Sequence, residues 1–512
     1  MTFGLWTLLM TYILALDQGT SSSRAVLYDA AGTVVASAQQ SIDSSYPHDG
    51  WVEQDPEMIW SSILRVGRQA IASANIEPTD IAAIGITNQR ETSILWERQT
   101  SRCLYNAIVW QDRRSAAYCE QLAEQRYPAD QADGQPMAEL IEHTTGLIID
   151  PYFSSTKLAW LLDQLDADRA RAENGELCFG TIDSFLVWRL TRGSEHVTDA
   201  TNASRTQLFD IGQQCWSQPL LDVFNVPAAV LPQVLDCVDD FGIADPEWFG
   251  AAIPIRGIAG DQQAALIGQA CFEPGMSKST YGTGCFVMTH TGQQISRSSQ
   301  QLLSTVAYRI NGEPSYALEG SIFVAGVAIQ WLRDQLGLIE HTADTADAFA
   351  RTGGDTHGVY VVPAFTGLGA PYWQPQARGL ITGLTLDSNK DHIITAFLQS
   401  VAFQTRTLLL AMAADGAPVS TLRVDGGMVV NDAFCQFLCD LLNVPVERPA
   451  DVETTVRGAG VLAAIGSGLF ADLHEAAELW QLGRRFDPDM ADDQREGLAE
   501  GYDQAVAQAL SR

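Results

Sequence analysis

Lysine is scarce in this sequence. Only Lys157, Lys278 and Lys390 occur, so Arg supplies nearly all of the positive charge. Acidic residues outnumber basic ones by 62 to 31, which gives a formal net charge of −31. A surface of that sign repels nucleic acid and anionic membranes. The sequence therefore predicts neither nucleic-acid binding nor stable membrane association.

Two explanations of the acidity remain open. It can be a property shared by the whole proteome of the source lineage. It can instead be an adaptation to salt, because screening relieves the self-repulsion of a charged surface. Only the second explanation requires stability to depend on NaCl.

Cysteine motifs and a recognisable export signal are also missing. Nine Cys are scattered without a Cys-x-x-Cys pair or a metal-ligand spacing, and their odd number favours a reducing cytoplasm. Residues 3–10 are apolar, but they lack the positive n-region and cleavage site of a signal peptide. Even extended to residue 16, the stretch is too short to span a bilayer. We expect residues 1–10 to form an N-terminal extension that leads into the first strand.

No low-complexity segment or Pro- and Gly-rich linker divides the 512 residues. That length predicts two large domains of roughly 250 residues each. The apolar fraction of 46% is ample for two packed cores. Strand-like runs alternate with helical patterns, which indicates α/β layers. We place the domain junction after residue 256, which gives domains at 11–256 and 257–512.

Three polar turns follow strand-like runs. The runs Tyr12–Leu16, Ile253–Ile258 and Ser277–Tyr281 are typical of strands, and each leads into a turn rich in Asp, Gly, Thr or Ser. In α/β folds, ligands bind at the carboxyl ends of strands. Gly lets backbone N–H groups approach an anion, Thr and Ser supply hydroxyls, and Asp can hold Mg²⁺ or take a proton. The pattern predicts a site that transfers a phosphoryl group from a nucleotide.

Other elements can be placed from local signals. Asp55-Pro56-Glu57 is typical of a helix start, with Asp as the N-cap and Pro at the first helical position. Ile81–Thr87 and Leu422–Val424 are typical of strands, and apolar spacing predicts a helix over Asp432–Leu442. The Gly- and Pro-containing segment Thr366–Gly379 is long enough to predict a functional loop.

Ten segments resemble one protein family, in the family's own order. Each segment alone is a weak signal, and the ordered set is specific. The segments are Asp17–Arg24, Gly50–Pro56, Gly85–Thr92, Asn106–Arg113, Asp150–Ser154, Thr198–Arg205, Gly257–Leu266, Tyr281–Phe286, Pro363–Trp373 and Asp425–Asn431. From about Tyr12 to Gly468 the chain resembles the FGGY family of carbohydrate kinases, and within it the members that phosphorylate glycerol.

The resemblance implies a fold and an activity. The fold is α/β, with two actin/Hsp70-like (ribonuclease H-like) domains and a nucleotide and substrate cleft between them. The N-terminal domain would bind glycerol and phosphate, and the C-terminal domain would carry the catalytic base and the adenosine site. The activity is phosphorylation of glycerol by ATP to sn-glycerol 3-phosphate and ADP, with Mg²⁺. A cytoplasmic homodimer or homotetramer is expected from the relatives.

Asp261 and Asp17 are the two candidate acids of this chemistry. In the family, the Asp of the Gly-Asp-Gln segment is the general base, so the resemblance assigns that role to Asp261. From position alone, Asp261 could equally cap a helix that begins near Gln262. Asp17 is assigned to Mg²⁺, although an Asp-x-Gly-Thr tetrapeptide can also be a simple hairpin turn.

The phosphates and the nucleoside have their own candidate residues. By resemblance, the residues of the first turn and of a facing loop in the other domain bind the phosphates, and two Gly-containing segments bind adenosine. A Gly-Gly turn alone could be an ordinary tight turn. The candidates are Thr20, Ser21, Ser22, Arg24 and Thr283 for phosphate and Gly326, Gln330, Gly427 and Asn431 for adenosine.

Substrate residues are predicted around the adjacent pair Arg90 and Glu91. Arg only donates hydrogen bonds and Glu only accepts them, so together they suit the closely spaced hydroxyls of a polyol. Without the family match, Arg90 and Glu91 could be a surface ion pair. The aromatic residues named next could likewise be core residues rather than walls of a substrate site. The resemblance adds Trp110, Tyr152, Gln262 and Phe286 to this set.

The sequence departs from the family in places. Trp248–Ala252 stands where many bacterial members have a Gly- and Arg-containing loop for a fructose bisphosphate effector, and it contains no Arg. That regulation is therefore not expected. Two other functions stay open: an FGGY kinase for another polyol or ketose such as xylulose, and an actin- or Hsp70-like ATPase. The second needs no polyol-binding residues, so the pairs Arg90-Glu91 and Asp261-Gln262 argue against it.

Overall fold

The computed structural model describes residues 11–127, 134–374 and 376–511. The expected extension at 1–10 lies outside these residues. The described residues form two compact units: those within 11–270, 305–315 and 454–479 form the first, and those within 271–304, 316–453 and 480–511 form the second. The units are thus interleaved along the chain, whereas the sequence predicts a single junction after residue 256.

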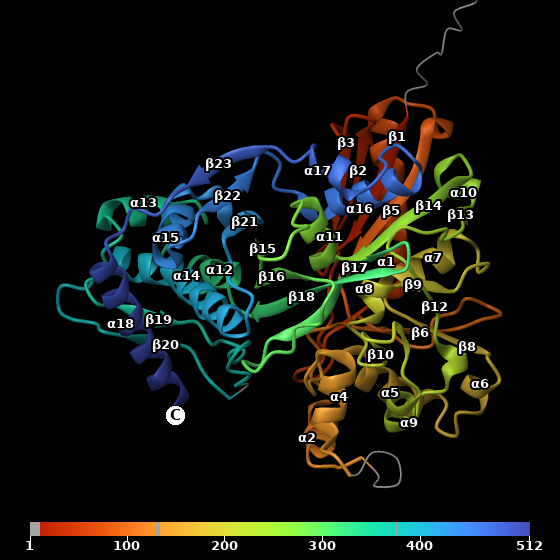
Figure 1. The fold of residues 1–512 in the computed structure, drawn as a ribbon, viewed down its shortest axis with the longest axis horizontal. Helices are drawn as coiled ribbons and strands as arrows, with labels where there is room; N and C mark the ends of the chain where they lie inside the picture. The colour runs from red at the N-terminus through yellow and green to blue at the C-terminus, as the bar shows by residue number, and fades with distance from the viewer. Residues whose placement is uncertain (1–10, 128–133, 375, 512) are drawn as a thin grey trace, which may run out of the picture. The chain divides into compact units, whose positions relative to one another are not determined.

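A six-stranded sheet is the frame of the first unit (Figure 1). At its centre β1 (Tyr12–Gln18) pairs antiparallel with β2 (Ser22–Asp29) and parallel with β5 (Ile81–Asn88). β14 (Ile253–Gly260) runs parallel to β5 on the other side. The predicted strands in these regions are confirmed, and each extends slightly further than predicted. The edge strands are β3 (Val34–Ser41) and β13 (Ile243–Ala244).

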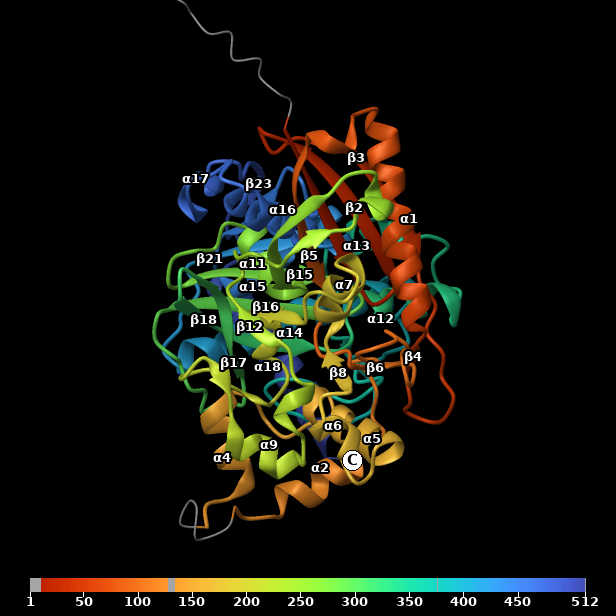
Figure 2. The ribbon, with the colours of Figure 1, turned by 90° about the vertical axis from the view of Figure 1, so that its right-hand side faces the viewer.

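Helices cover both faces of this sheet. Successive side chains of β1 point to opposite faces, and helices bury the apolar ones on each side. Leu14 packs in the same core as Ile59 of α1 (Pro56–Ala74), and Ile13 packs with Ala459 of α16 (Thr454–Gly466). Figure 2 shows α1 and α16 on either side of β2. As predicted, Asp55 caps α1: its carboxylate accepts a hydrogen bond from the Glu57 N–H at 2.9 Å.

A smaller, mostly helical region completes the first unit around a second core that contains Leu158 and Phe179. Further helices of the unit are α2 (Ala116–Ala123), α4 (Met137–Thr145), α5 (Ser154–Leu165), α6 (Ala170–Glu173), α7 (Ile182–Leu190), α8 (Ala200–Ala203), α9 (Gln218–Phe224), α10 (Pro246–Phe249), α11 (Asp261–Gly268) and α17 (Leu473–Ala477). Its short strands are β4 (Glu53–Gln54), β6 (Ile94–Glu97), β7 (Ala107–Ile108), β8 (Leu177–Gly180), β9 (Val197–Asp199), β10 (Phe209–Asp210), β11 (Cys215–Trp216) and β12 (Gln233–Leu235).

The second sheet has seven strands in the order β17-β18-β16-β15-β21-β22-β23. It lies mostly in the second unit, but residues 305–315, which hold most of β17 and the start of β18, belong to the first unit. The strands are β15 (Met276–Tyr281), β16 (Cys285–Gly292), β17 (Leu303–Ile310), β18 (Glu313–Ile322), β21 (Thr421–Asp425), β22 (Val446–Pro449) and β23 (Leu482–Phe486). A hairpin of β19 (Tyr360–Val362) and β20 (Leu380–Thr382) bounds the predicted long loop.

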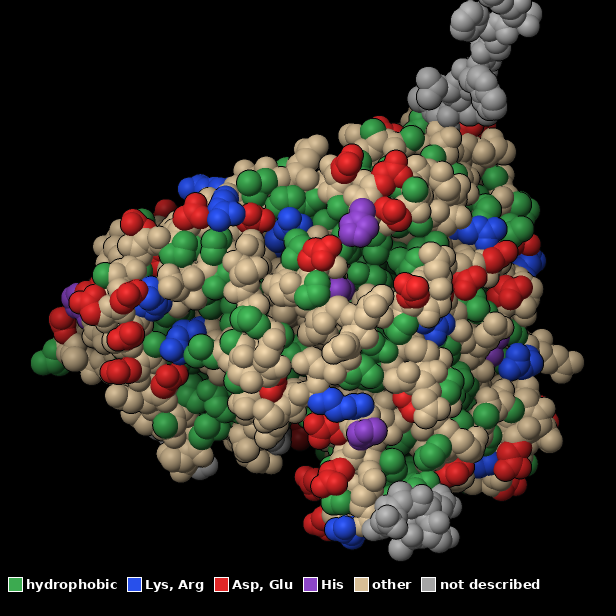
Figure 3. All heavy atoms as spheres, in the orientation of Figure 1, with side chains coloured by type: hydrophobic (Ala, Val, Ile, Leu, Met, Phe, Trp, Pro, Cys, Tyr) green, Lys and Arg blue, Asp and Glu red, His purple; other side chains and the backbone are tan. Residues whose placement is uncertain are grey.

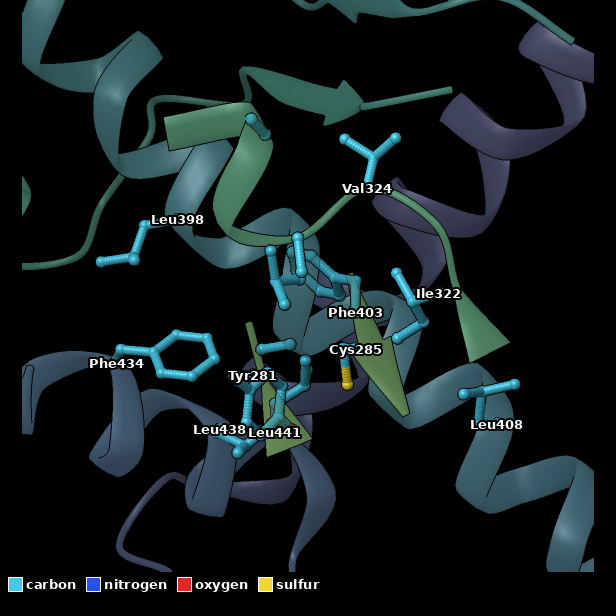
Figure 4. Packing of buried hydrophobic residues seen from close by; sticks show 14 of the residues in the cluster. Tyr281, Cys285, Ile322, Val324, Leu398, Phe403, Leu408, Phe434, Leu438 and Leu441 are labelled. Atoms are coloured by element: carbon cyan, nitrogen blue, oxygen red, sulfur yellow. The ribbon is translucent and has the colours of Figure 1, made fainter. Parts of the chain in front are cut away.

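In the described part of this unit the α-helices are α12 (Gly326–Asp334), α13 (Asp344–Thr352), α14 (Lys390–Ala414), α15 (Asp432–Leu442) and α18 (Asp492–Leu510). The predicted helix 432–442 is confirmed. In the core, Tyr281 of β15 meets Phe434 of α15 edge to face with ring centroids 5.2 Å apart (Figure 4). This contact ties the end of β15 to the segment that follows β21.

Three further features of the described residues concern membrane insertion, surface charge and thiols. Among the described residues, α14 alone is long and apolar enough to cross a bilayer, and 67% of its most apolar window is buried, as in the core helix of a folded domain. Asp and Glu side chains are scattered over the face drawn in Figure 3, where they lie among Lys and Arg. All nine Cys are free thiols.

Candidate active site

The carboxyl ends of three parallel strands meet in the first unit. Asp17 of β1 lies opposite Thr87 of β5, and Thr87 lies opposite Ala259 of β14. The residues that follow each strand therefore gather at one edge of the sheet. They include Asp261 and the segment 89–91, which directly follow β14 and β5.

Asp261 and Arg90 touch at this edge. The Nε of Arg90 lies 3.1 Å from Oδ1 of Asp261, and the exposed fractions of the two side chains are 1% and 28%. Arg90 also donates to Oε1 of Gln263 at 3.2 Å. Because the guanidinium is buried and fixed, it holds the more exposed carboxylate in one direction. Asp261 is the first residue of α11, and Oδ1 also accepts from the N–H of Gln262 at 2.7 Å.

Glu91 is held by Arg205, for which the sequence predicts no role. The Nε of Arg205 donates to Oε1 of Glu91 at 2.6 Å, and both side chains are almost wholly buried. Glu91 is therefore not part of a surface ion pair. A buried ion pair fixes the orientation of its members, because separating them would leave an uncompensated charge. The only sequence signal for Arg205 is its place in the family-like segment Thr198–Arg205.

Asp17 has an unusual electrostatic environment. Burial raises the pKa of Asp17 to about 7; the positive charge of Arg24 opposes this shift and the negative charge of Asp261 adds to it. Across the hairpin Arg24 lies opposite Asp17 in register and donates to Oε1 of Gln39 at 3.0 Å. Gln39 in turn donates to the hydroxyl of Ser22 at 3.0 Å. The predicted residues Arg24 and Ser22 thus lie on one strand beside Asp17.

The turn after β1 is joined to a pair of aromatic residues. Trp110 donates from Nε1 to the hydroxyl of Thr20 at 2.8 Å, and its ring lies edge-on to Tyr152 with centroids 5.5 Å apart. Lys157 is buried, and its Nζ donates to the carbonyls of Tyr152 at 2.5 Å and Phe153 at 3.0 Å. Burial lowers the pKa of Lys157 to about 8, although the negative charge of Glu91 opposes the shift. These contacts fix the loop that carries Tyr152.

The second unit contains a cavity of about 540 Å³, within the range of small-molecule sites. The residues that the sequence predicts for the nucleotide in this part of the chain all line it: Thr283, Gly326, Gln330, Gly427 and Asn431. The turn after β15, the start of α12 and the 3₁₀ turn Gly427–Val430 form its walls.

Backbone contacts hold these walls together. The N–H of Gly326 donates to the carbonyl of Gly282 at 2.9 Å, which joins α12 to the turn. Asn431 caps α15 with its side-chain oxygen and donates from Nδ2 to Thr345 of α13 at 3.3 Å. Phe286, the remaining predicted substrate residue, is half-buried on β16 in this same unit.

Comparison with known proteins defines the class of this protein. Residues 12–268 match the model of the N-terminal domain of the FGGY family of carbohydrate kinases, and residues 278–467 match the model of the C-terminal domain. The fold and the site thus define a carbohydrate kinase with two α/β units, as the sequence predicts. The chain belongs to the FGGY family of carbohydrate kinases.

Individual relatives cover nearly the full length. The chain is 55% identical to glycerol kinase 1 of Pseudomonas aeruginosa, over 98% of this chain and 99% of the relative. The crystal structure of Plasmodium falciparum glycerol kinase with ADP matches with 34% identity and a TM-score of 0.88, over 98% of each chain. A xylulose kinase from Lactobacillus acidophilus has a TM-score of 0.84 at 21% identity and shares the fold.

Proposed function

We propose that this protein transfers the γ-phosphoryl group of ATP to glycerol, giving sn-glycerol 3-phosphate and ADP. Relatives that are 55% identical over nearly the full chain and carry the name glycerol kinase support this function. The observation that carries it is the contact of Asp261 with buried Arg90, beside Glu91, at the ends of three parallel strands. A clustered donor and two acceptors suit a small polyol.

The reaction assigns a role to each side chain. Asp261 accepts the proton of a primary hydroxyl while the hydroxyl oxygen forms its bond to the γ-phosphorus. The bond between that phosphorus and the β–γ bridging oxygen breaks, and its electron pair leaves with ADP. Arg90 and Glu91 hold the other hydroxyls, and Arg90 keeps Asp261 in position. Trp110 packs against the carbon chain, Tyr152 offers a hydroxyl, and Gln262 holds a further hydroxyl of glycerol.

The nucleotide belongs, in this proposal, to the cavity of the second unit. An ADP-bound structure that is 34% identical supports a nucleotide in the family fold. Gly326 and Gly427 would let the nucleoside lie against bare backbone, and Asn431 and Gln330 offer amide groups. Thr283 would bind phosphate from the turn after β15, and Thr20, Ser21 and Ser22 would do so from the first unit. Phe286 remains a proposed substrate wall.

Asp17 fits a Mg²⁺ ion. Its carboxylate accepts no side-chain hydrogen bond from the described residues, and Asp261 is near enough to raise its pKa. No cluster of three or more His, Cys, Asp or Glu suitable for a metal occurs in the described part of the chain. That agrees with a Mg²⁺ that takes one or two carboxylates together with phosphate and water oxygens. The ion neutralises phosphate charge when bound.

The proposal also covers the cellular compartment and the oligomeric state of the enzyme. Nine free thiols support a reducing, cytoplasmic environment. Assembly as a homodimer or homotetramer remains a prediction.

Measurement of ADP release in a coupled assay tests the function directly. The purified protein is given ATP, Mg²⁺ and, in turn, glycerol, dihydroxyacetone, xylulose and gluconate. We expect kcat/KM for glycerol to exceed that for xylulose and gluconate by at least about 100-fold, because polar groups in the site are left unpaired by an ill-fitting acceptor. Preference for xylulose would support the other kinase function. ADP release that no acceptor accelerates would support an ATPase.

A further inference from the structure

A buried carboxylate, that of Asp199, lies behind the candidate active site. Asp199 ends β9 and precedes α8, and its side chain is fully buried. Oδ1 accepts from the backbone N–H of Asn202 at 3.1 Å and from its Nδ2 at 2.8 Å. Oδ2 accepts from the N–H of Thr201 at 2.7 Å, from its hydroxyl at 2.6 Å and from the Cys237 thiol at 3.3 Å. All of these partners are donors, so the carboxylate fixes the orientation of Thr201 and Asn202.

Thr201 in turn accepts a hydrogen bond from the end of β14. The N–H of Gly260, the last residue of that strand, donates to the hydroxyl oxygen of Thr201 at 2.9 Å. Because a backbone N–H can only donate, the hydroxyl hydrogen of Thr201 must point to Asp199. Gly260 directly precedes Asp261 in the sequence.

Asn202 is hydrogen-bonded to the end of β5. Its Nδ2 donates to Oδ1 of Asn88 at 3.1 Å, and Nδ2 of Asn88 donates back to Oδ1 of Asn202 at 3.0 Å. Asn88 is the last residue of β5, two residues before Arg90. One carboxylate therefore governs hydrogen bonds to the ends of both strands that carry the reactive pair.

Gly260, at the end of β14, lies close to the side chain of Arg90. A Cβ at Gly260 would lie 2.7 Å from Cγ and 2.8 Å from Cδ of Arg90. The backbone before Asp261 therefore lies close against the side chain of Arg90, whose Nε is 3.1 Å from the Asp261 carboxylate.

We propose that Thr201, oriented by Asp199, is a positioning residue for the phosphoryl transfer. Its hydroxyl accepts the Gly260 N–H and thereby sets the direction of the Asp261 carboxylate relative to Arg90. The inference rests on the proposed function. It adds that the correct position of the Asp261 carboxylate depends on the Thr201 hydroxyl, which belongs to neither the proposed glycerol site nor the proposed ATP site.

Three variants test this role in the full-length protein. Thr201→Val keeps the shape of the side chain and removes the acceptor, while Thr201→Ser restores the hydroxyl. Thr145→Val is the matched control. Thr145 is also a buried Thr, and among the described residues its hydroxyl bonds within its own turn alone, to the Ile141 carbonyl at 2.7 Å and the Leu147 N–H at 3.1 Å. Steady-state kinetics with glycerol and ATP and the Tm are measured for each protein.

We expect Thr201→Val to lower kcat by about 10- to 100-fold with KM for ATP unchanged, because a small misplacement of a reacting group carries a cost of this size. Thr201→Ser should recover most of the loss, and Thr145→Val should keep the wild-type kcat. A kcat for Thr201→Val within twofold of wild type, or an equal loss in Thr145→Val, would overturn the inference. A wild-type protein that does not phosphorylate glycerol would instead refute the proposed function.

Discussion

At the scale of single residues, the site combines a fixed cation with a more exposed anion. Arg90 is almost wholly buried, and Asp261 keeps 28% of its side chain exposed. A proton acceptor must be reachable by substrate, whereas the group that orients it works best when its own position is fixed. The different burial of the two partners agrees with these different roles.

Asp261→Asn tests the base. We expect kcat for glycerol to fall by about 10²–10⁴, because the amide cannot accept the hydroxyl proton. Asp334→Asn, which alters an exposed ion pair with Arg333, is the control and should keep full activity. Near-normal turnover of purified Asp261→Asn would reject the assignment.

Asp17 should make stability depend on pH. The pKa of its carboxyl is about 7 in the folded chain and about 4 when unfolded. At a pH between these two values, Asp17 is protonated in the folded chain and ionised in the unfolded chain. Protonation of Asp17 therefore stabilises the fold. This stabilisation is complete below pH of about 4 and is lost as the pH rises through about 7. Without Mg²⁺ and nucleotide, the Tm of wild type should therefore fall relative to that of Asp17→Asn from pH 5 to 8. A constant Tm difference between the two proteins across that range would contradict the pKa.

At the scale of elements, the sequence predicts what local signals determine. The bounds of α15 follow from the Asn431 cap and the apolar spacing that begins at Phe434, and the turn after β1 follows from its Asp and Gly. Contacts across long sequence distances could not be predicted in the same way. Arg205 lies 114 residues from Glu91, and Thr201 lies 59 residues from Gly260. These residues come together because α8, which contains Thr201, and Arg205 just after it pack near the ends of β14 and β5.

The turn after β15 and the start of α12 offer a test at this scale. A Cβ at Gly326 would lie 2.5 Å from the carbonyl oxygen of Gly282, so Gly326→Ala must displace the turn that carries Thr283. Overpacking of this kind costs about 1–3 kcal/mol. If the cost falls on nucleotide binding, KM for ATP rises by about 5- to 150-fold while KM for glycerol is unchanged.

The control is Gly497→Ala in α18, where nothing lies within 4 Å of the added Cβ. It should leave both KM values unchanged and stabilise the fold by up to about 1 kcal/mol, because Ala favours a helix more than Gly does. Equal changes in both KM values for Gly326→Ala would place the turn outside the nucleotide site.

At the scale of the whole molecule, the net charge of −31 is the dominant property. If the acidity is an adaptation to salt, the Tm should rise with NaCl, because the screening length falls from about 10 Å at 0.1 M to about 3 Å at 1 M. KCl should act equally, and the dependence should vanish near the isoelectric point, where self-repulsion is absent. A flat curve at neutral pH would favour the lineage-wide explanation.

The interleaving of the two units constrains how the chain is made. The face of the first sheet that contains Ile13 is covered by α16, which the ribosome supplies only after most of the second unit. Until α16 is synthesised, the apolar sheet face that contains Ile13 is left uncovered. Premature termination before residue 454 should therefore yield insoluble protein rather than a free N-terminal half, and translation speed through the second unit should influence the yield.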